Sequence, residues 1–316
     1  MAIGIIAILA APIVPDDPNR EGYGTMVFMK KAGIVALIGR PNVGKSTLLN
    51  NLIGRKVSIT SPKPQTTRFT TQAVYEDDRG QIVFYDTPGI FARVEDALAA
   101  KINMTAEAAL KQHVDLVLYI IDHTRDREIE ENKTLGLVRK ADVPKILVVN
   151  KFDIKEPSYI EQYAFLEDEF DTIVKVSALK RTHLNKLLEE IFNKLPKGDA
   201  LVDTKSLVQP AINIDSRRFI SELIREKVFL QTRREVPYTL TVEVDEVVER
   251  ANGLLYIKAR ILTTADRYKK MLIGEGGRKI KEIGMYARKE IELATDKQVY
   301  LELTVETDPH WVERMI

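Results

Sequence analysis

A loop bracketed by glycines, with a lysine and a serine at its end, is the clearest chemical feature of this chain. Residues 39–46 have the sequence GRPNVGKS, after an apolar run (Ile34 to Ile38) and before a helical stretch (Thr47 to Leu52). In such a strand–loop–helix setting, backbone N–H groups and the helix N-terminus cradle phosphates. We expect Lys45 to reach the terminal phosphates and the Ser46 hydroxyl to ligate Mg²⁺. The predicted nucleotide-binding residues here are Gly39, Asn42, Val43, Gly44, Lys45, Ser46 and Thr47.

A second polar motif ends another apolar run. Asp86 to Gly89, with the sequence DTPG, comes directly after Ile82 to Tyr85, which predicts a position at the carboxyl end of a strand. Ligands of open α/β sheets bind at such ends. The Asp86 carboxylate can hold the Mg²⁺ shell there through water, and the Gly89 N–H can meet the γ-phosphate.

A third strand end predicts which nucleotide binds. Asn150 to Asp153 (NKFD) follows the apolar run Ile146 to Val149. The Asp153 carboxylate can accept two N–H bonds from guanine, whereas adenine has no such pair of donors on that edge. The Lys151 stem can lie along the base face, and the Asn150 amide can tie neighbouring loops together.

A fourth run, Ile173 to Val176, leads into Ser177, Ala178 and Leu179, whose backbone amides can cap the guanine oxygen. Taken alone, this motif and the preceding one are more often ordinary surface turns. In this order, each at a strand end, the motifs predict that the ligand is GTP. The predicted base-recognition residues are Asn150, Lys151, Asp153, Ser177, Ala178 and Leu179.

Composition limits the chemistry and the number of domains. The 316 residues suffice for about two domains that each bury a core, and the net charge of +1 does not by itself indicate a nucleic-acid partner. The chain has no cysteine, which excludes disulfides, thiolate metal sites and a cysteine nucleophile and is in keeping with a reducing cytosol. The four histidines lack ligand spacing, so we expect solvated or packing roles for them.

Residues 1–28 are predicted to lie outside the fold. Ala2 to Val14 is almost wholly apolar, and Pro15 to Gly24 is polar and contains prolines. The apolar run is too short for a membrane-spanning helix, and no Lys or Arg precedes it as in a secretory signal. We interpret it as a misplaced start or an appended tail, with the true protein beginning near Met26 or Met29. A weak membrane anchor is the alternative interpretation.

From Ile34 to about Leu195, apolar β-type runs alternate with helical stretches. With ligand residues at strand ends, this alternation predicts an α/β fold, a P-loop GTPase domain with a doubly wound, mostly parallel sheet. We place this domain at residues 29–197 and a linker at residues 198–210, because Leu195 to Asp199 breaks the pattern. The predicted helices are Thr47–Gly54, Asp96–Gln112, Glu128–Lys140, Ser158–Asp168 and His183–Asn193.

Residues 211–316 have a different order of elements. The pattern predicts a helix (Arg217 to Leu230), two alternating strands, two helices and a last strand (Val299 to Val305). Between the two later helices lies Ile273 to Ile280, with the sequence IGEGGRKI. A Gly-x-x-Gly turn joining two helices is how a KH module clamps single-stranded RNA. The order of elements predicts an α+β type II KH domain.

The chemistry of this turn suits a phosphate backbone. Its glycines allow close approach, and the helix beginning near Gly277 favours phosphate. A Gly-x-x-Gly sequence alone occurs in many turns, and the basic residues of a helix usually only face solvent. The prediction of RNA binding therefore depends on the order of the surrounding elements. Glu275 places a like charge near phosphate, which neighbouring basic residues can offset. The predicted RNA-binding residues are Lys269, Lys270, Ile273, Gly274, Glu275, Gly276, Gly277, Arg278, Lys279 and Lys281.

The pairing of these motifs resembles the bacterial Era family of GTPases, from about Gly33 to the end of the chain. The resemblance implies a ribosome-assembly factor that binds the 3′ end of small-subunit (16S) ribosomal RNA and associates loosely with the inner membrane. It also makes Gln65 to Arg68 the first switch, in which one threonine closes on Mg²⁺ and the γ-phosphate. Thr66 is the slightly better candidate and Thr67 the other. The predicted catalytic residues are then Lys45, Ser46, Thr66, Thr67, Asp86 and Gly89, and the predicted metal ligands Ser46, Thr66 and Asp86.

The residue after the DTPG motif predicts slow hydrolysis. Many related switches have a glutamine there that positions water, but this chain has Ile90, whose side chain cannot orient water. We expect slow intrinsic GTPase activity that depends on another group or partner. Related enzymes with this substitution can use K⁺ beside the phosphates, held by an asparagine at the position of Asn42. The implied cofactors are therefore GTP/GDP, Mg²⁺ and K⁺.

Three functions of different kinds are open from the sequence. A GTPase that supports RNA modification would carry a different second domain, and the Gly274 to Gly277 module argues against it. A membrane-surface GTPase would use the apolar N-terminus and the basic helix from Arg278 to Lys289. We favour a GTP-gated RNA-binding switch in assembly of the 30S subunit. We expect it to be a cytoplasmic monomer, with peripheral contact to the cytoplasmic face of the inner membrane as the weaker expectation.

Overall fold

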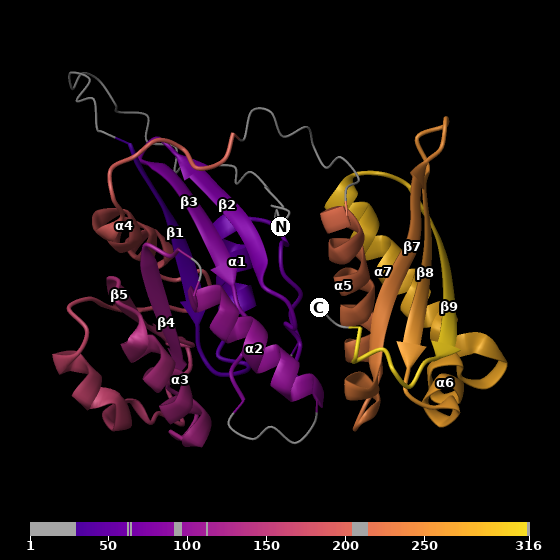
Figure 1. The fold of residues 1–316 in the computed structure, drawn as a ribbon, viewed down its shortest axis with the longest axis horizontal. Helices are drawn as coiled ribbons and strands as arrows, with labels where there is room; N and C mark the ends of the chain where they lie inside the picture. Colours follow the sequence, from indigo (N-terminus) through magenta and orange to yellow (C-terminus); the bar gives the residue numbers. More distant parts are fainter. Residues whose placement is uncertain are drawn as a thin grey trace.

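The computed structural model describes residues 30–61, 63, 65–91, 97–111, 113–203 and 214–314. These residues form two units, which lie side by side in Figure 1. The predicted extension at residues 1–28 lies outside the described residues, as do residues 204–210 of the predicted linker.

The first unit is built around a six-stranded sheet in the order β2-β3-β1-β4-β5-β6. All neighbouring strands are parallel except β2 and β3, which are antiparallel. Every residue of β3 and β4 is buried, as expected for parallel strands covered on both faces. The strands are β1 Lys31–Ile38, β2 Thr71–Asp77, β3 Gly80–Asp86, β4 Leu116–Asp122, β5 Lys145–Asn150 and β6 Ile173–Lys175. The predicted doubly wound, mostly parallel sheet is confirmed.

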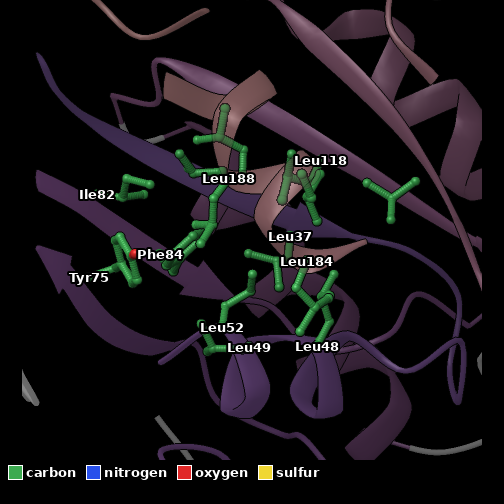
Figure 2. Packing of buried hydrophobic residues seen from close by; sticks show 14 of the residues in the cluster. Leu37, Leu48, Leu49, Leu52, Tyr75, Ile82, Phe84, Leu118, Leu184 and Leu188 are labelled. Carbon is green, nitrogen blue, oxygen red and sulfur yellow. The ribbon is translucent and has the colours of Figure 1, made fainter. Parts of the chain in front are cut away.

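Hydrophobic clusters on the two faces of this sheet hold its helices in place. Figure 2 shows one cluster, in which Leu48 of α1 and Leu184 of α4 pack around Leu37 of β1. The cluster on the other face includes Ala106 of α2 and Leu135 of α3. The helices are α1 Lys45–Ile53, α2 Ala97–Lys111, α3 Ile129–Lys140 and α4 Leu184–Lys194.

The segment predicted to be helical at Ser158–Asp168 forms a 3₁₀-helix, η1 (Ile160–Asp168). Tyr163 and Leu166 are buried, and Ile160 packs against the same cluster. These apolar residues recur at every third position, a spacing that matches the three residues per turn of a 3₁₀-helix.

The second unit has a three-stranded sheet, β7-β8-β9, with β7 antiparallel and β9 parallel to β8. Alternate residues of β8, from Leu255 to Ile261, are buried in a core shared with the helices. This is the predicted order helix–strand–strand–helix–turn–helix–strand. The elements are α5 Ile214–Gln231, η2 Val236–Thr239, β7 Leu240–Glu249, β8 Leu255–Thr263, α6 Asp266–Ile273, η3 Glu275–Gly277, α7 Arg278–Thr295 and β9 Val299–Thr307.

Candidate functional site

The phosphate-type loop joins β1 to α1. Gly44, the residue before α1, has φ 99°, a left-handed conformation that other residues rarely adopt. A Cβ at this position would lie 2.3 Å from Nδ2 of Asn150, so glycine is what lets the loop pack against the base-recognition motif. Asn150 donates to the Val43 carbonyl oxygen at 2.7 Å, and its Oδ1 accepts from the Ala178 N–H at 2.9 Å. The prediction that Asn150 ties neighbouring loops together is confirmed.

Lys45 places its ammonium inside this loop. Its Nζ donates to the carbonyl oxygens of Gly39 at 2.8 Å and Arg40 at 3.1 Å. Burial lowers the pKa of Lys45 to about 8, against the opposing effect of the Asp86 and Glu131 carboxylates. A buried ammonium is stabilised when an anion reaches it, so the loop is electrostatically suited to phosphate.

Oxygen atoms from separate segments meet beside the loop. The Ser46 hydroxyl donates to Asp86 Oδ2 at 2.6 Å and lies 3.0 Å from Oγ1 of Thr67. Ser58 also donates to Asp86 Oδ2 at 2.6 Å, while Asp86 Oδ1 has no hydrogen-bond partner in the described part of the chain. Burial raises the pKa of Asp86, and the bonds from Ser46 and Ser58 oppose that rise. A carboxylate and hydroxyl groups in this arrangement fit a hard cation such as Mg²⁺.

The two threonines of the predicted switch differ in their contacts. Thr66 Oγ1 donates to the carbonyl oxygen of Lys63 at 2.6 Å, whereas Thr67 Oγ1 is the hydroxyl beside Ser46. This arrangement favours Thr67 as the metal-side threonine, although the sequence slightly favours Thr66. A cavity of about 60 Å³ between these segments is lined, among others, by Asn42, Lys45, Ser46, Thr47, Thr67 and Gly89.

The motifs predicted to recognise the base follow β5 and β6. Ser177 and Ala178 are buried, whereas Asp153 and Leu179 are exposed. Lys151 Nζ forms an ion pair with Asp122 Oδ2 at 2.5 Å, and Asp122 is the last residue of β4. The structure therefore adds a third strand end to this part of the site.

Sequence reasoning missed Asp122 and Ser58. Asp122 ends the apolar run from Leu116 to Ile121, so the pattern that identified Asp86 could have identified it. Ser58 lies in a segment without helical or strand periodicity, and only the fold brings it to Asp86.

Ile90 is buried with 1% of its surface exposed, in the cluster that contains Ile38 and Ile121. Its side chain therefore packs into the core of the first unit. This agrees with the prediction that residue 90 does not orient water.

The Gly-x-x-Gly turn joins the end of α6 to the start of α7, as predicted. Gly276 and Gly277 have φ values of 58° and 76°, and a Cβ at either position would meet no described atom within 4 Å. The backbone is thus open to close approach at these two residues of the turn. Glu275 pairs with Arg278 at 2.5 Å on the exposed surface, so the like charge is offset within the turn itself.

Basic side chains surround this turn. Lys270, Arg278 and Lys281 are exposed, and Lys269 and Lys279 are partly buried. Arg233 and Arg234, which sequence reasoning missed, lie between α5 and η2. They line a cleft of about 270 Å³ together with Met271 and Lys279. Both arginines are distant from the turn in sequence, so no local pattern links them to it.

Residues between α1 and the first switch contact the second unit. Lys56 Nζ pairs with Glu226 at 2.5 Å and with Glu290 at 2.7 Å. The Thr60 N–H donates to Glu226 Oε1 at 2.8 Å. Ile59 is buried in the hydrophobic core of the second unit. Helices α5 and α7 therefore hold the segment between α1 and the first switch.

The switch itself is bound in the same way. Arg225 of α5 donates to the carbonyl oxygen of Thr66, and Lys63, two residues before the switch, donates to that of Phe229. The buried guanidinium of Arg68 lies over the rings of Phe229 (5.5 Å) and Trp311 (5.3 Å). Movement of this segment must therefore disturb contacts with the second unit.

Comparisons with known proteins agree with this architecture. A family model described as 50S ribosome-binding GTPase matches residues 34–151, and a KH domain model matches residues 235–312. The GTPase Era of Halothermothrix orenii is 40% identical over 286 residues, which cover 90% of this chain and 95% of that protein. The GTPase Era of Aquifex aeolicus is 37% identical over 298 residues, which cover 90% of this chain and 96% of that protein.

Two solved structures are also similar over 90% of this chain and 96% of theirs. A variant of Aquifex aeolicus Era bound to GDP·AlF4⁻ has a TM-score of 0.82 and 37% identity. Era in complex with MgGDPNP and nucleotides 1506–1542 of 16S ribosomal RNA has a TM-score of 0.82 and 36% identity. With both domains, their order and nearly the whole length in common, this chain belongs to the Era family of GTPases.

Proposed function

We propose that this protein is a GTP-hydrolysing molecular switch that binds the single-stranded 3′ end of 16S ribosomal RNA and assists assembly of the 30S subunit. One similar Era structure contains MgGDPNP and nucleotides 1506–1542 of 16S ribosomal RNA, and another contains GDP·AlF4⁻. This chain has the residues that a phosphate loop, a guanine-recognition loop and a Gly-x-x-Gly clamp require.

The contact between the first switch and α5 is the observation that carries this proposal. Thr67 Oγ1 lies 3.0 Å from the hydroxyl of Ser46, a proposed Mg²⁺ ligand, and the carbonyl oxygen of its neighbour Thr66 accepts a hydrogen bond from Arg225. Closure of the switch on Mg²⁺ and the γ-phosphate therefore alters the contact between Thr66 and Arg225 of α5. Because α5 packs against α7, whose first residue follows the clamp, a chain of contacts joins the nucleotide to the RNA site.

Each nucleotide-site residue has a definite role in this proposal. Lys45 and the loop amides neutralise phosphate charge, and Ser46, a switch threonine and Asp86 hold Mg²⁺ directly or through water. Asp153 selects guanine. The Mg²⁺ ion would neutralise charge that develops on the phosphate oxygens during hydrolysis.

Potassium is proposed as an additional cofactor, held beside the phosphates by Asn42. Asn42 lines the cavity at the loop, and its φ of 64° is uncommon for a residue other than glycine. Single-turnover hydrolysis should be faster in K⁺ than in Na⁺ buffer at equal ionic strength. Equal rates in the two buffers would remove this role of Asn42.

Crosslinking to total RNA tests the proposed function directly. Purified protein loaded with a GTP analogue or with GDP is crosslinked, and the recovered RNA is sequenced. We expect reads at the 3′ end of 16S ribosomal RNA that depend on the nucleotide and disappear in a variant substituted at Gly276 and Gly277. Recovery of unrelated RNA in every state would contradict the proposal.

The competing functions have less support. A GTPase for RNA modification would need another second domain, whereas residues 235–312 match a KH domain. Among the helices that the structure describes, none has both the length and the apolar character needed to cross a bilayer. We propose a cytoplasmic monomer with weak peripheral attachment to the inner membrane. Flotation with liposomes, with and without the residues before Met26, tests that attachment.

A further inference from the structure

We propose that His123 is a positioning residue that holds the guanine-recognition loop, residues 150–153, in its binding conformation. The inference rests on the proposed binding of guanine nucleotides. His123 is the first residue after β4, and only 3% of its surface is exposed. It belongs to none of the nucleotide motifs, and its spacing to other residues gives no sign of a role.

The imidazole joins two segments that follow different strands. Its Nε2 lies 3.2 Å from the carbonyl oxygen of Lys151, and its Nδ1 lies 3.1 Å from Oγ of Ser158. Because a carbonyl oxygen can only accept, Nε2 must carry the proton. In the neutral ring Nδ1 is then the acceptor for the Ser158 hydroxyl. The two partners therefore select one tautomer and one ring orientation.

The peptide group between Lys151 and Phe152 is held at both of its polar atoms. Its carbonyl oxygen accepts from the Ile154 N–H at 2.9 Å and from His123, and its N–H donates to the carbonyl oxygen of Val176 at 3.0 Å. His123 and Val176 are thus its two anchors outside the loop. These two anchors come from the ends of β4 and β6, on either side of β5. A peptide plane bonded in two opposite directions cannot rotate without breaking one of the bonds.

Such an anchor is needed because of the local backbone. Lys151 has φ 61°, in the left-handed region that is strained for a residue with a side chain. Its ammonium is also tied to the β4 end, through the 2.5 Å ion pair with Asp122. Asp122 and His123 together hold both the side chain and the carbonyl group of Lys151.

This anchor affects the direction of the Asp153 side chain, because Asp153 lies two residues after the carbonyl group that His123 binds. Asp153 is exposed, so its direction depends on the backbone that precedes it. Two parallel bonds to guanine need correct alignment of that carboxylate. His123 thus contributes to base selection without touching the base.

Two substitutions that differ only in reach test this inference. In His123→Gln, the side-chain amide can occupy the place of Nε2 and keep the bond to the Lys151 carbonyl oxygen. In His123→Asn, the shorter amide matches Nδ1 and can reach only Ser158. His113→Ala, at a histidine whose side chain is 83% exposed, is the matched control.

The readout is the ratio of the dissociation constants for IDP and GDP, with binding stoichiometry measured in parallel. IDP lacks the exocyclic amine and makes one bond fewer to Asp153. A misaligned carboxylate therefore lowers the affinity for GDP more than the affinity for IDP. We expect His123→Asn to reduce the preference for GDP about three- to tenfold, the loss of roughly one hydrogen bond. His123→Gln and His113→Ala should keep the preference, and every variant should keep full stoichiometry.

The possible outcomes separate this inference from the proposed function. A wild-type protein that does not prefer GDP to ADP would remove the guanine-binding function, and this inference with it. A normal wild-type preference that His123→Asn retains would overturn the inference alone. Equal losses in the asparagine and glutamine variants would also overturn it, because they would indicate a packing role of the ring instead of the bond to Lys151.

Discussion

At the scale of single residues, the proposed selection of guanine depends on one carboxylate, that of Asp153, whose neighbours are held by hydrogen bonds and an ion pair. Asn150 is bonded to Val43 and Ala178, and Lys151 is paired with Asp122. Asp153 is exposed and makes the base contacts in the proposed function. Charge-assisted bonds are stronger than neutral ones, so this carboxylate should dominate the choice of nucleotide.

Asp153→Asn should therefore change the specificity without unfolding the protein. Loss of both charge-assisted bonds, about 1.5–3 kcal/mol each, should weaken GTP binding by at least about a hundredfold. The asparagine amide can instead donate to the 2-oxygen of xanthosine triphosphate, so affinity for that nucleotide should rise. Fluorescence competition assays measure both constants, with the exposed Asp171→Asn as the control. Unchanged GTP affinity would contradict the base-recognition assignment.

At the scale of elements, α5 is one of the parts of the second unit that contact the first. Figure 1 shows α5 as the helix of the second unit that faces the first. Glu226 accepts the Thr60 N–H and pairs with Lys56, while its neighbour Arg225 bonds Thr66. One turn of α5 thus holds both the switch and the segment before it.

Glu226→Ala should weaken the coupling between nucleotide and RNA. The variant should still bind GTP and RNA separately, but the nucleotide dependence of its RNA affinity should fall by about 0.5–2 kcal/mol. Titrations of labelled RNA in the GDP and GTP-analogue states measure this difference. Glu249→Gln, which breaks an exposed ion pair with Lys297 at the end of β7, serves as the control. If RNA affinity in Glu226→Ala depends on the nucleotide as strongly as in the wild type, the coupling does not pass through Glu226.

The Gly-x-x-Gly turn gives a second prediction at this scale. Gly276→Asp combines a strained left-handed conformation with a negative charge where RNA phosphate should lie. RNA affinity should fall at least about tenfold while nucleotide binding is unchanged, as measured by fluorescence anisotropy. Gly253→Asp has similar backbone geometry, with φ 78° and equally open space, but lies in the β7–β8 turn. Equal effects of the two substitutions would contradict a specific RNA role of Gly276.

The sequence predicted the elements and motifs that depend on neighbouring residues. Strand ends carrying GRPNVGKS, DTPG and NKFD could be placed because apolar runs precede them directly. The bond from Ser58 to Asp86 and the pairing of Lys56 with Glu226 could not be predicted, because these residues meet only after the chain has folded. The role proposed for His123 was hidden for the same reason, since its partner Lys151 follows another strand.

At the scale of the whole molecule, the contacts between the two domains fit a switch with two arrangements. The first switch is bonded to Arg225, and the buried Arg68 guanidinium lies over the rings of Phe229 and Trp311 of the second unit. A ligand shifts such an equilibrium only as far as its affinities for the two states differ. In the proposed switch, GTP and RNA favour the same arrangement, so the effect of one on the affinity for the other is reciprocal.

The affinity of the purified protein for an oligonucleotide of the 16S 3′ end, measured without nucleotide, with GDP and with a GTP analogue, is the most direct test. The account predicts binding at least about fivefold tighter with the GTP analogue than with GDP, the lower end of typical allosteric coupling. The same dissociation constant in all three states would contradict it.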